Sequence, residues 1–127
     1  MGNFNTGFWR SLNQAWRGFL YVWKTEGHLQ FHLFAGTVVL GAAWCFKLSR
    51  MEWLLLVYAI GAVIATEVIN TAVELVVDLI QPNFHPLAGM AKDVAAGAVL
   101  VAVIQAVFIG VGIFWTPMRN WIGAWLP

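Results

Sequence analysis

Residues 53–80 read WLLLVYAIGAVIATEVINTAVELVVDLI, an apolar run that carries three carboxylates and an asparagine near its end. A helix of this length measures about 42 Å, more than the roughly 30 Å of hydrocarbon in a bilayer. The run is therefore predicted to be a membrane-spanning helix. The polar residues inside it require an explanation, because a helix in contact with lipid does not tolerate them.

The composition places the rest of the chain in a membrane as well. Of its 127 residues, 61% are hydrophobic and only 10% are charged, and the mean hydropathy is +0.74. Soluble domains carry about 25% charged residues. Two more apolar runs, 29–46 and 94–115, approach or exceed the length that spans a bilayer. We expect an all-α integral membrane protein with transmembrane helices at 29–46, 53–80 and 94–115, in one domain that covers residues 1–127.

The segment before the first run has the pattern of an amphipathic helix. Between residues 8 and 24, apolar side chains recur every three or four positions on one face, and polar side chains recur on another. The apolar set is Trp9, Leu12, Trp16, Phe19, Leu20 and Trp23, and the polar set is Arg10, Gln14, Arg17, Tyr21 and Lys24. This pattern predicts a surface helix in the membrane interface. The net charge of +1, without a basic cluster, argues against a nucleic-acid partner.

The distribution of positive charges gives a weak indication of how the chain is oriented in the membrane. Three spans put the two termini on opposite sides of the membrane. A cytoplasmic N-terminus places four basic residues inside, namely Arg10, Arg17, Lys24 and Lys92, and three outside, namely Lys47, Arg50 and Arg119. The positive-inside rule therefore favours this orientation by one residue, with the polar loop 81–93 facing the cytoplasm.

The polar residues of the second run share one face. At 100° per residue they fall within an arc of about 80°. They are Glu67, Asn70, Glu74 and Asp78. Each intramembrane charge costs about 2.5–3.5 kcal/mol, so three carboxylates exposed to lipid would cost roughly 8–10 kcal/mol. Three helices offer little interior for such a stripe, which favours partner subunits.

The depth of these residues suggests their chemistry. If Trp53 marks the far boundary, Glu67 lies about 9 Å below the near boundary and Glu74 lies at it. Helix parity brings further polar residues to that same side. We use "the mouth" for the set Glu26, Glu74, Asp78, Lys92 and Asp93.

Acidic oxygens at the mouth suit Mg²⁺ shared with phosphates, and a lysine suits phosphate oxygens. The submerged Glu67 is placed to take a proton from a lipid hydroxyl. Together these features predict phosphoryl transfer from a metal–nucleotide to a membrane alcohol. The GxxxxGK[ST] loop and the HRD and DFG motifs of the common kinase folds do not occur in the sequence.

With these residues assembled, the chain resembles the prokaryotic diacylglycerol kinase family, which includes the undecaprenol kinases. The motif E-x-x-N-[ST]-A-x-E-x-x-V-D occurs as EVINTAVELVVD at 67–78, Glu26 lies upstream, and AKDVAAGAVL follows at 91–100. The second segment is more similar to the undecaprenol kinase branch. The resemblance implies a homotrimer in the bacterial cytoplasmic (inner) membrane that phosphorylates undecaprenol or diacylglycerol with Mg-ATP. The active sites would lie between subunits and face the cytoplasm.

The resemblance also implies roles for single residues. Glu67 would be the catalytic base, supported by Asn70, and Glu26 and Glu74 would hold the Mg²⁺ of Mg-ATP. The implied nucleotide contacts are Glu26, Glu74, Lys92 and Asp93. Further candidate nucleotide contacts at the same mouth are Asp78 and the loop residues Asn83, Phe84 and His85. One position departs from the family pattern, because Gln30 stands where relatives often carry arginine.

Other interpretations remain beside these. A small proton-coupled transporter would also place a glutamate in a span, but it would not explain the Lys-Asp pair at the mouth. Asp93 is also a candidate N-cap of the third span. His28 and His32 have the i, i+4 spacing of zinc ligands but lack a third ligand, so His32 is interpreted as a satisfied polar residue. Close helix packing is expected at four glycines, namely Gly36, Gly61, Gly97 and Gly110.

Overall fold

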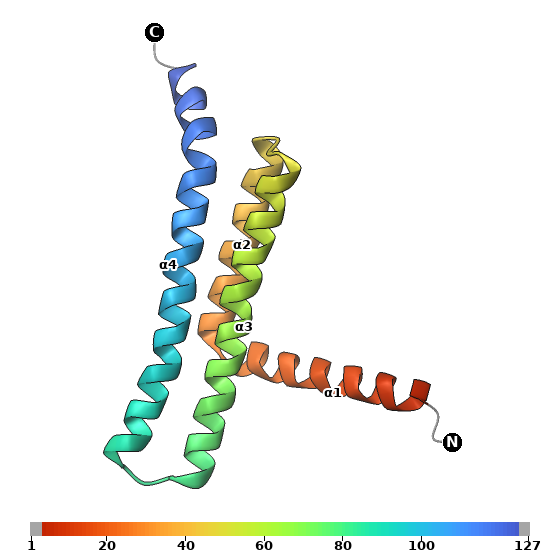
Figure 1. The fold of residues 1–127 in the computed structure, drawn as a ribbon, viewed down its shortest axis with the longest axis vertical. Helices are drawn as coiled ribbons and strands as arrows, with labels where there is room; N and C mark the ends of the chain where they lie inside the picture. The colour runs from red at the N-terminus through yellow and green to blue at the C-terminus, as the bar shows by residue number, and fades with distance from the viewer. Residues whose placement is uncertain (1–3, 125–127) are drawn as a thin grey trace.

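The computed structural model describes residues 4–124, and this part of the chain is helical throughout apart from short connections (Figure 1). The elements are α1 (Phe4–Thr25), α2 (Gly27–Cys45), α3 (Arg50–Ile80) and α4 (Pro86–Gly123). Helices α2, α3 and α4 run side by side, and α3 packs against both of the others. Helix α1 leaves the side of this bundle at a large angle, and the end of α3 and the start of α4 extend beyond it.

Helix α1 contains the predicted amphipathic segment and is almost entirely exposed. Its contact with the bundle lies near its C-terminal end, where Val22 is buried. The Nε2 group of Gln30 donates a hydrogen bond to the Trp23 carbonyl at 2.8 Å. That carbonyl belongs to the last turn of α1, where carbonyls lack partners within the helix. In this chain Gln30 therefore joins α1 to α2.

The connection between α2 and α3 is tight, as predicted. Lys47 adopts a left-handed conformation with φ 53°, and the N–H groups of Lys47 and Leu48 donate to carbonyls in the last turn of α2, the pattern of a Schellman motif. Ser49 then caps α3: its hydroxyl accepts from the Glu52 N–H, and its own N–H donates to the Glu52 carboxylate. Hydrogen bonds from the Ser49 side chain and backbone lower the pKa of Glu52 from its ordinary value.

Helices α2 and α3 approach closely at one glycine. A Cβ atom on Gly36 would lie 2.9 Å from Cγ2 of Ile60, so only glycine permits this approach without a shift. At Gly61, Gly97 and Gly110 nothing lies within 4 Å of such an atom. The expectation of close packing thus holds at Gly36. At the other three glycines no other helix of the described part of this chain approaches closely.

Helix α4 begins and ends outside the predicted span. It starts at Pro86, capped by Nδ1 of His85, which accepts the Leu87 N–H at 3.2 Å. Asp93 lies two turns inside the helix, so the prediction that it caps the third span is wrong. The predicted loop 81–93 is reduced to a short connection, because good helix formers such as Leu87 continue the helix into the polar segment.

The surface of the chain is more extended and more apolar than that of a soluble domain. It exposes 9893 Å², whereas a compact soluble protein of this mass exposes about 6,700 Å². Among the described residues, α3 and α4 are long and apolar enough to cross a membrane, by length and composition only. Helix α2 is shorter and carries His28, Gln30 and His32 in its first turns. The all-helical, apolar architecture is consistent with an all-α membrane protein.

Candidate active site between the first and second predicted spans

Glu67 lies on the face of α3 that packs against α2 and is only 6% exposed. It continues a row of buried positions at spacings of three and four, namely Leu56, Ala59, Val63, Glu67 and Thr71. Its Oε1 atom lies 3.1 Å from Nε2 of His32 on α2. The predicted catalytic carboxylate therefore has a partner on a neighbouring helix, and His32 is a satisfied polar residue, as interpreted from the sequence.

The contact with His32 gives the level of Glu67 along the bundle. His32 follows Glu26, the N-cap of α2, by six positions, which corresponds to about 9 Å of helix. Because α2 and α3 are antiparallel, moving seven positions from Glu67 to Glu74 returns about 10 Å toward the start of α2. Glu26 and Glu74 therefore lie at similar levels, with Glu67 about 9 Å below them.

Asn70 and Glu74 form a hydrogen-bonded pair on α3. Nδ2 of Asn70 donates to Oε1 of Glu74 at 2.8 Å and so orients the carboxylate. Oδ1 of Asn70 is buried and has no hydrogen-bond partner among the described residues. A buried acceptor left unpaired costs about 1–3 kcal/mol, so this oxygen is available to a donor that a ligand supplies.

Asp78 and Lys92 join α3 to α4 at the mouth. The Lys92 ammonium lies 2.6 Å from Oδ1 of Asp78. Both side chains are partly exposed, so the pair contributes little stability, about 1 kcal/mol at most. An ammonium group has three N–H donors, and this contact leaves donors free for phosphate oxygens. Asp93 follows Lys92 and is exposed on α4.

The remaining predicted site residues are near the ends of helices and are not joined to the α3 carboxylates. Glu26 is the N-cap of α2, and its side chain makes no capping hydrogen bond. Phe84 is 94% exposed, and Nδ1 of His85 is occupied by the cap of α4. Among residues 4–124, no hydrogen bond or ion pair links Glu26, Asp93 or the loop 83–85 to Glu67, Glu74 or Asp78.

The carboxylate oxygens at the mouth are ligands of the kind that suits a hard cation. Within the described part of the chain, no group of three His, Cys, Asp or Glu side chains is arranged to hold a metal ion. Glu26 and Glu74 offer carboxylate oxygens at one level of the bundle, and neither is neutralised by an ion pair among the described residues. Two carboxylates fit Mg²⁺, which takes its other ligands from phosphates and water.

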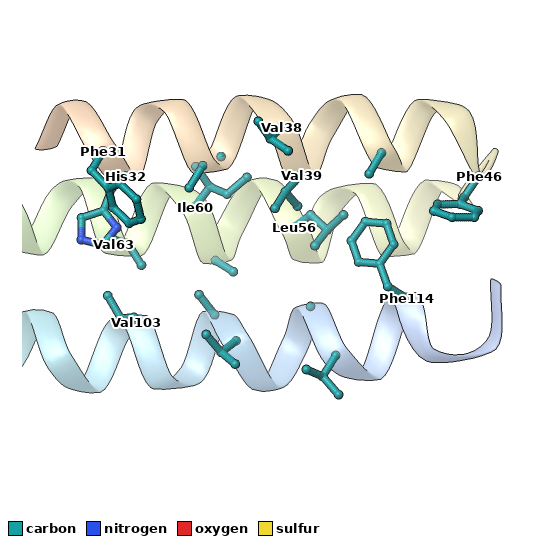
Figure 2. A pocket seen from close by; sticks show the side chains of 18 of the residues that line it. Phe31, His32, Val38, Val39, Phe46, Leu56, Ile60, Val63, Val103 and Phe114 are labelled. Carbon is teal, nitrogen blue, oxygen red and sulfur yellow. The ribbon is translucent and has the colours of Figure 1, made fainter. Parts of the chain in front are cut away.

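An apolar groove of about 550 Å³ runs between α2, α3 and α4 (Figure 2). Its lining side chains come from all three helices. Phe46 and Phe114 lie toward one end, in edge-to-face contact with ring centroids 6.0 Å apart. His32 lies toward the other end and is the polar side chain among the described residues that line the groove. The groove therefore leads along α2 toward the partner of Glu67.

His32 was not among the site residues predicted from the sequence. A partial signal for its contact was present, because the separations of residues 32 and 67 from the tight turn at 46–49 agree to within about one helical turn. Two antiparallel helices joined by a short turn bring such positions to the same level. The register between the two helices decides whether these residues meet. The periodicity within one helix does not give this register.

Known proteins match most of this chain. A family model described as prokaryotic diacylglycerol kinase matches residues 13–114, a range that contains every predicted site residue. An undecaprenol kinase of Bacillus subtilis (strain 168) is 42% identical over 107 residues, 84% of this chain and 87% of that protein. A diacylglycerol kinase of Escherichia coli (strain K12) is 32% identical over 119 residues, 91% of this chain and 98% of that protein.

Proposed function

This chain belongs to the prokaryotic diacylglycerol kinase family, and on that basis we propose that it transfers the γ-phosphate of ATP to the hydroxyl group of a membrane lipid. The acceptor is undecaprenol or diacylglycerol, and the product is undecaprenyl phosphate or phosphatidic acid. The observation that carries the proposal is the buried Glu67, about 9 Å below the level of Glu26 and Glu74. The comparisons favour this activity over a proton-coupled transporter.

The proposed reaction assigns a proton to Glu67. The lipid hydroxyl oxygen attacks the γ-phosphorus, the bond from that phosphorus to the ADP oxygen breaks, and the hydroxyl proton passes to the Glu67 carboxylate. Glu26 and Glu74 would hold Mg²⁺ with the nucleotide, and this ion would supply charge neutralisation at the phosphate oxygens. Asn70 keeps the Glu74 carboxylate in one orientation through its 2.8 Å hydrogen bond.

The nucleotide lies at the mouth in this proposal. Lys92 uses its remaining N–H donors for phosphate oxygens, and Asp78 holds its ammonium group in place at 2.6 Å. The other nucleotide contacts are Asp93 and the loop 83–85. This loop joins α3 to α4 at the end of the bundle where the mouth lies (Figure 1).

The acceptor is held mainly by its apolar part. The groove of about 550 Å³ has a lining that is apolar except for His32, which suits a hydrocarbon chain and gives little basis for choosing between two lipid alcohols. An acceptor chain in the groove brings its hydroxyl group to the His32 end, beside Glu67.

We further propose a trimer of three-span subunits in the bacterial cytoplasmic (inner) membrane, with the mouth on the cytoplasmic side, where ATP is available. Helix α2 lies along α3 and measures about 28 Å, close to the hydrocarbon thickness. Helix α1 leaves the bundle at a large angle, as a helix in the membrane interface does. The large exposed apolar surface supports partner subunits as well as lipid.

A single assay tests the activity. Purified protein in lipid micelles is incubated with Mg²⁺ and ATP labelled at the γ-phosphate, in parallel with diacylglycerol and with undecaprenol, and the lipid fraction is separated. Label in a lipid product is expected for the wild type and should be strongly reduced for Glu67→Gln. Absence of label from every lipid alcohol, with a folded wild-type preparation, would refute the proposed function.

A further inference from the structure

His32 contacts the proposed catalytic base, yet the reaction described above gives it no role. Its Nε2 atom lies 3.1 Å from Oε1 of Glu67, and the two side chains are 19% and 8% exposed. The contact joins α2 to α3, so it forms only when the two helices pack together. A buried carboxylate needs hydrogen-bond donors, and His32 is placed to supply one to Glu67.

The two carboxylate oxygens of Glu67 differ in their surroundings. Oε1 faces the imidazole, whereas Oε2 accepts no hydrogen bond from the described residues and is not among the fully buried unpaired atoms. An N–H donor 3.1 Å from Oε1 is placed to hold the carboxylate in one orientation, which leaves Oε2 to receive a proton. Such an orientation matters, since a displacement of about 1 Å of a catalytic group costs on the order of 10²-fold in rate.

His32 also lines the apolar groove, at the end that Figure 2 shows opposite Phe46 and Phe114. An acceptor that enters along the groove therefore meets the imidazole, which in turn contacts the Glu67 carboxylate. Its hydroxyl group reaches Oε2 only if the carboxylate does not rotate away. The position of the histidine thus fits a role in the chemical step, on the acceptor side of the site and away from the mouth.

We propose that His32 is a positioning residue for phosphoryl transfer: its Nε2–H group donates to Oε1 of Glu67 and directs Oε2 toward the acceptor hydroxyl. This inference rests on the proposed lipid kinase function. His32 acts through Glu67 and does not contact the nucleotide. Its loss should therefore lower kcat and leave the KM for Mg-ATP unchanged.

Two amide variants separate positioning from polarity. In His32→Gln the amide nitrogen can take the place of Nε2, whereas in His32→Asn the side chain is one methylene shorter and does not reach Glu67. We expect His32→Gln to keep kcat within about threefold of the wild type and His32→Asn to lower it by about 10-fold or more. His28→Asn is the matched control, because His28 lies one turn earlier on α2, is exposed and does not contact Glu67. It should keep wild-type kinetics.

A double-mutant cycle tests whether His32 acts through Glu67. If it does, the Glu67→Gln protein should lose no further activity when His32→Asn is added. Multiplicative losses would overturn the proposal, as would equal kcat values in the two amide variants, whether high or low. All variants are compared after their size in mild detergent has been matched to the wild type.

The same experiment keeps the inference distinct from the proposed function. A wild type that phosphorylates no lipid refutes the kinase proposal itself. A wild type that is active and a Glu67→Gln variant that is slow, together with a His32→Asn variant of normal kcat, refute the role of His32 and leave the kinase proposal standing.

Discussion

Glu67 and Glu74 are seven positions apart on α3, yet they lie in different surroundings. Glu67 is buried against α2 and paired with His32, whereas Glu74 is half-buried, accepts from Asn70 and lies at the level of the mouth. We predict that Glu67→Gln lowers kcat by on the order of 10²-fold or more, the usual contribution of a general base, with the KM for Mg-ATP retained. Steady-state kinetics with varied Mg-ATP measure both constants.

Glu74→Gln should behave differently, because a neutral amide removes charge opposite the cation. It should raise the KM for Mg-ATP as well as lower kcat. Equal loss of nucleotide binding in both variants, with assembly intact, would show that the two carboxylates form one metal site. The division of roles by depth would then be wrong.

At the scale of elements, the turn between α2 and α3 contains a strained position. Lys47 adopts φ 53°, a conformation that costs a non-glycine residue about 1–2 kcal/mol. Glycine removes this strain but loses about 0.5–1 kcal/mol more chain entropy on folding. Lys47→Gly should therefore raise the free energy of unfolding by about 0.5–1 kcal/mol. Denaturation in mixed micelles measures this change, and a lower stability than the wild type would contradict the prediction.

The packing of α2 on α3 gives a second prediction at this scale. Gly36→Val should lower the free energy of unfolding by about 1–3 kcal/mol, since the added Cβ would meet Cγ2 of Ile60 at 2.9 Å, on a stiff β-branched side chain. Gly41→Val on the same helix is the control, because nothing lies within 4 Å of that position. The same denaturation experiment compares them, and equal losses would show that intrinsic helix propensity, not packing, decides the effect.

Periodicity within one helix predicted much of this molecule, and features that depend on two helices escaped it. A helix over residues 8–24 and the tight turn after α2 were confirmed, because both follow from local patterns. The start of α4 was placed too late, since the polar pair Lys92–Asp93 indicated a loop although a helix can continue beyond the hydrocarbon. The contact between His32 and Glu67 could not be read from either helix, as it depends on their register.

At the scale of the whole molecule, the apolar surface of α4 has too little cover within the chain. Ala102 is the residue of α4 that is buried among those described, while large side chains such as Phe108 and Trp115 are exposed. Lipid can cover such residues, but the carboxylates of α3 require protein or water. The outer faces of the bundle therefore need apolar cover, whereas the carboxylates of α3 need polar surroundings. An assembly of subunits would provide both.

The orientation of the assembly leads to a prediction about access. The loop between α3 and α4 should face the cytoplasm, and the turn between α2 and α3 should face the other side. Cys45 is the single cysteine, so Cys45→Ser gives a background in which Asn83→Cys and Arg50→Cys each introduce one exposed thiol. A thiol reagent that does not cross membranes should label position 50 in intact cells and position 83 only after the cells are opened. Labelling of position 83 from outside would place the mouth on the side without ATP, and a three-span chain with a cytoplasmic site would then be ruled out.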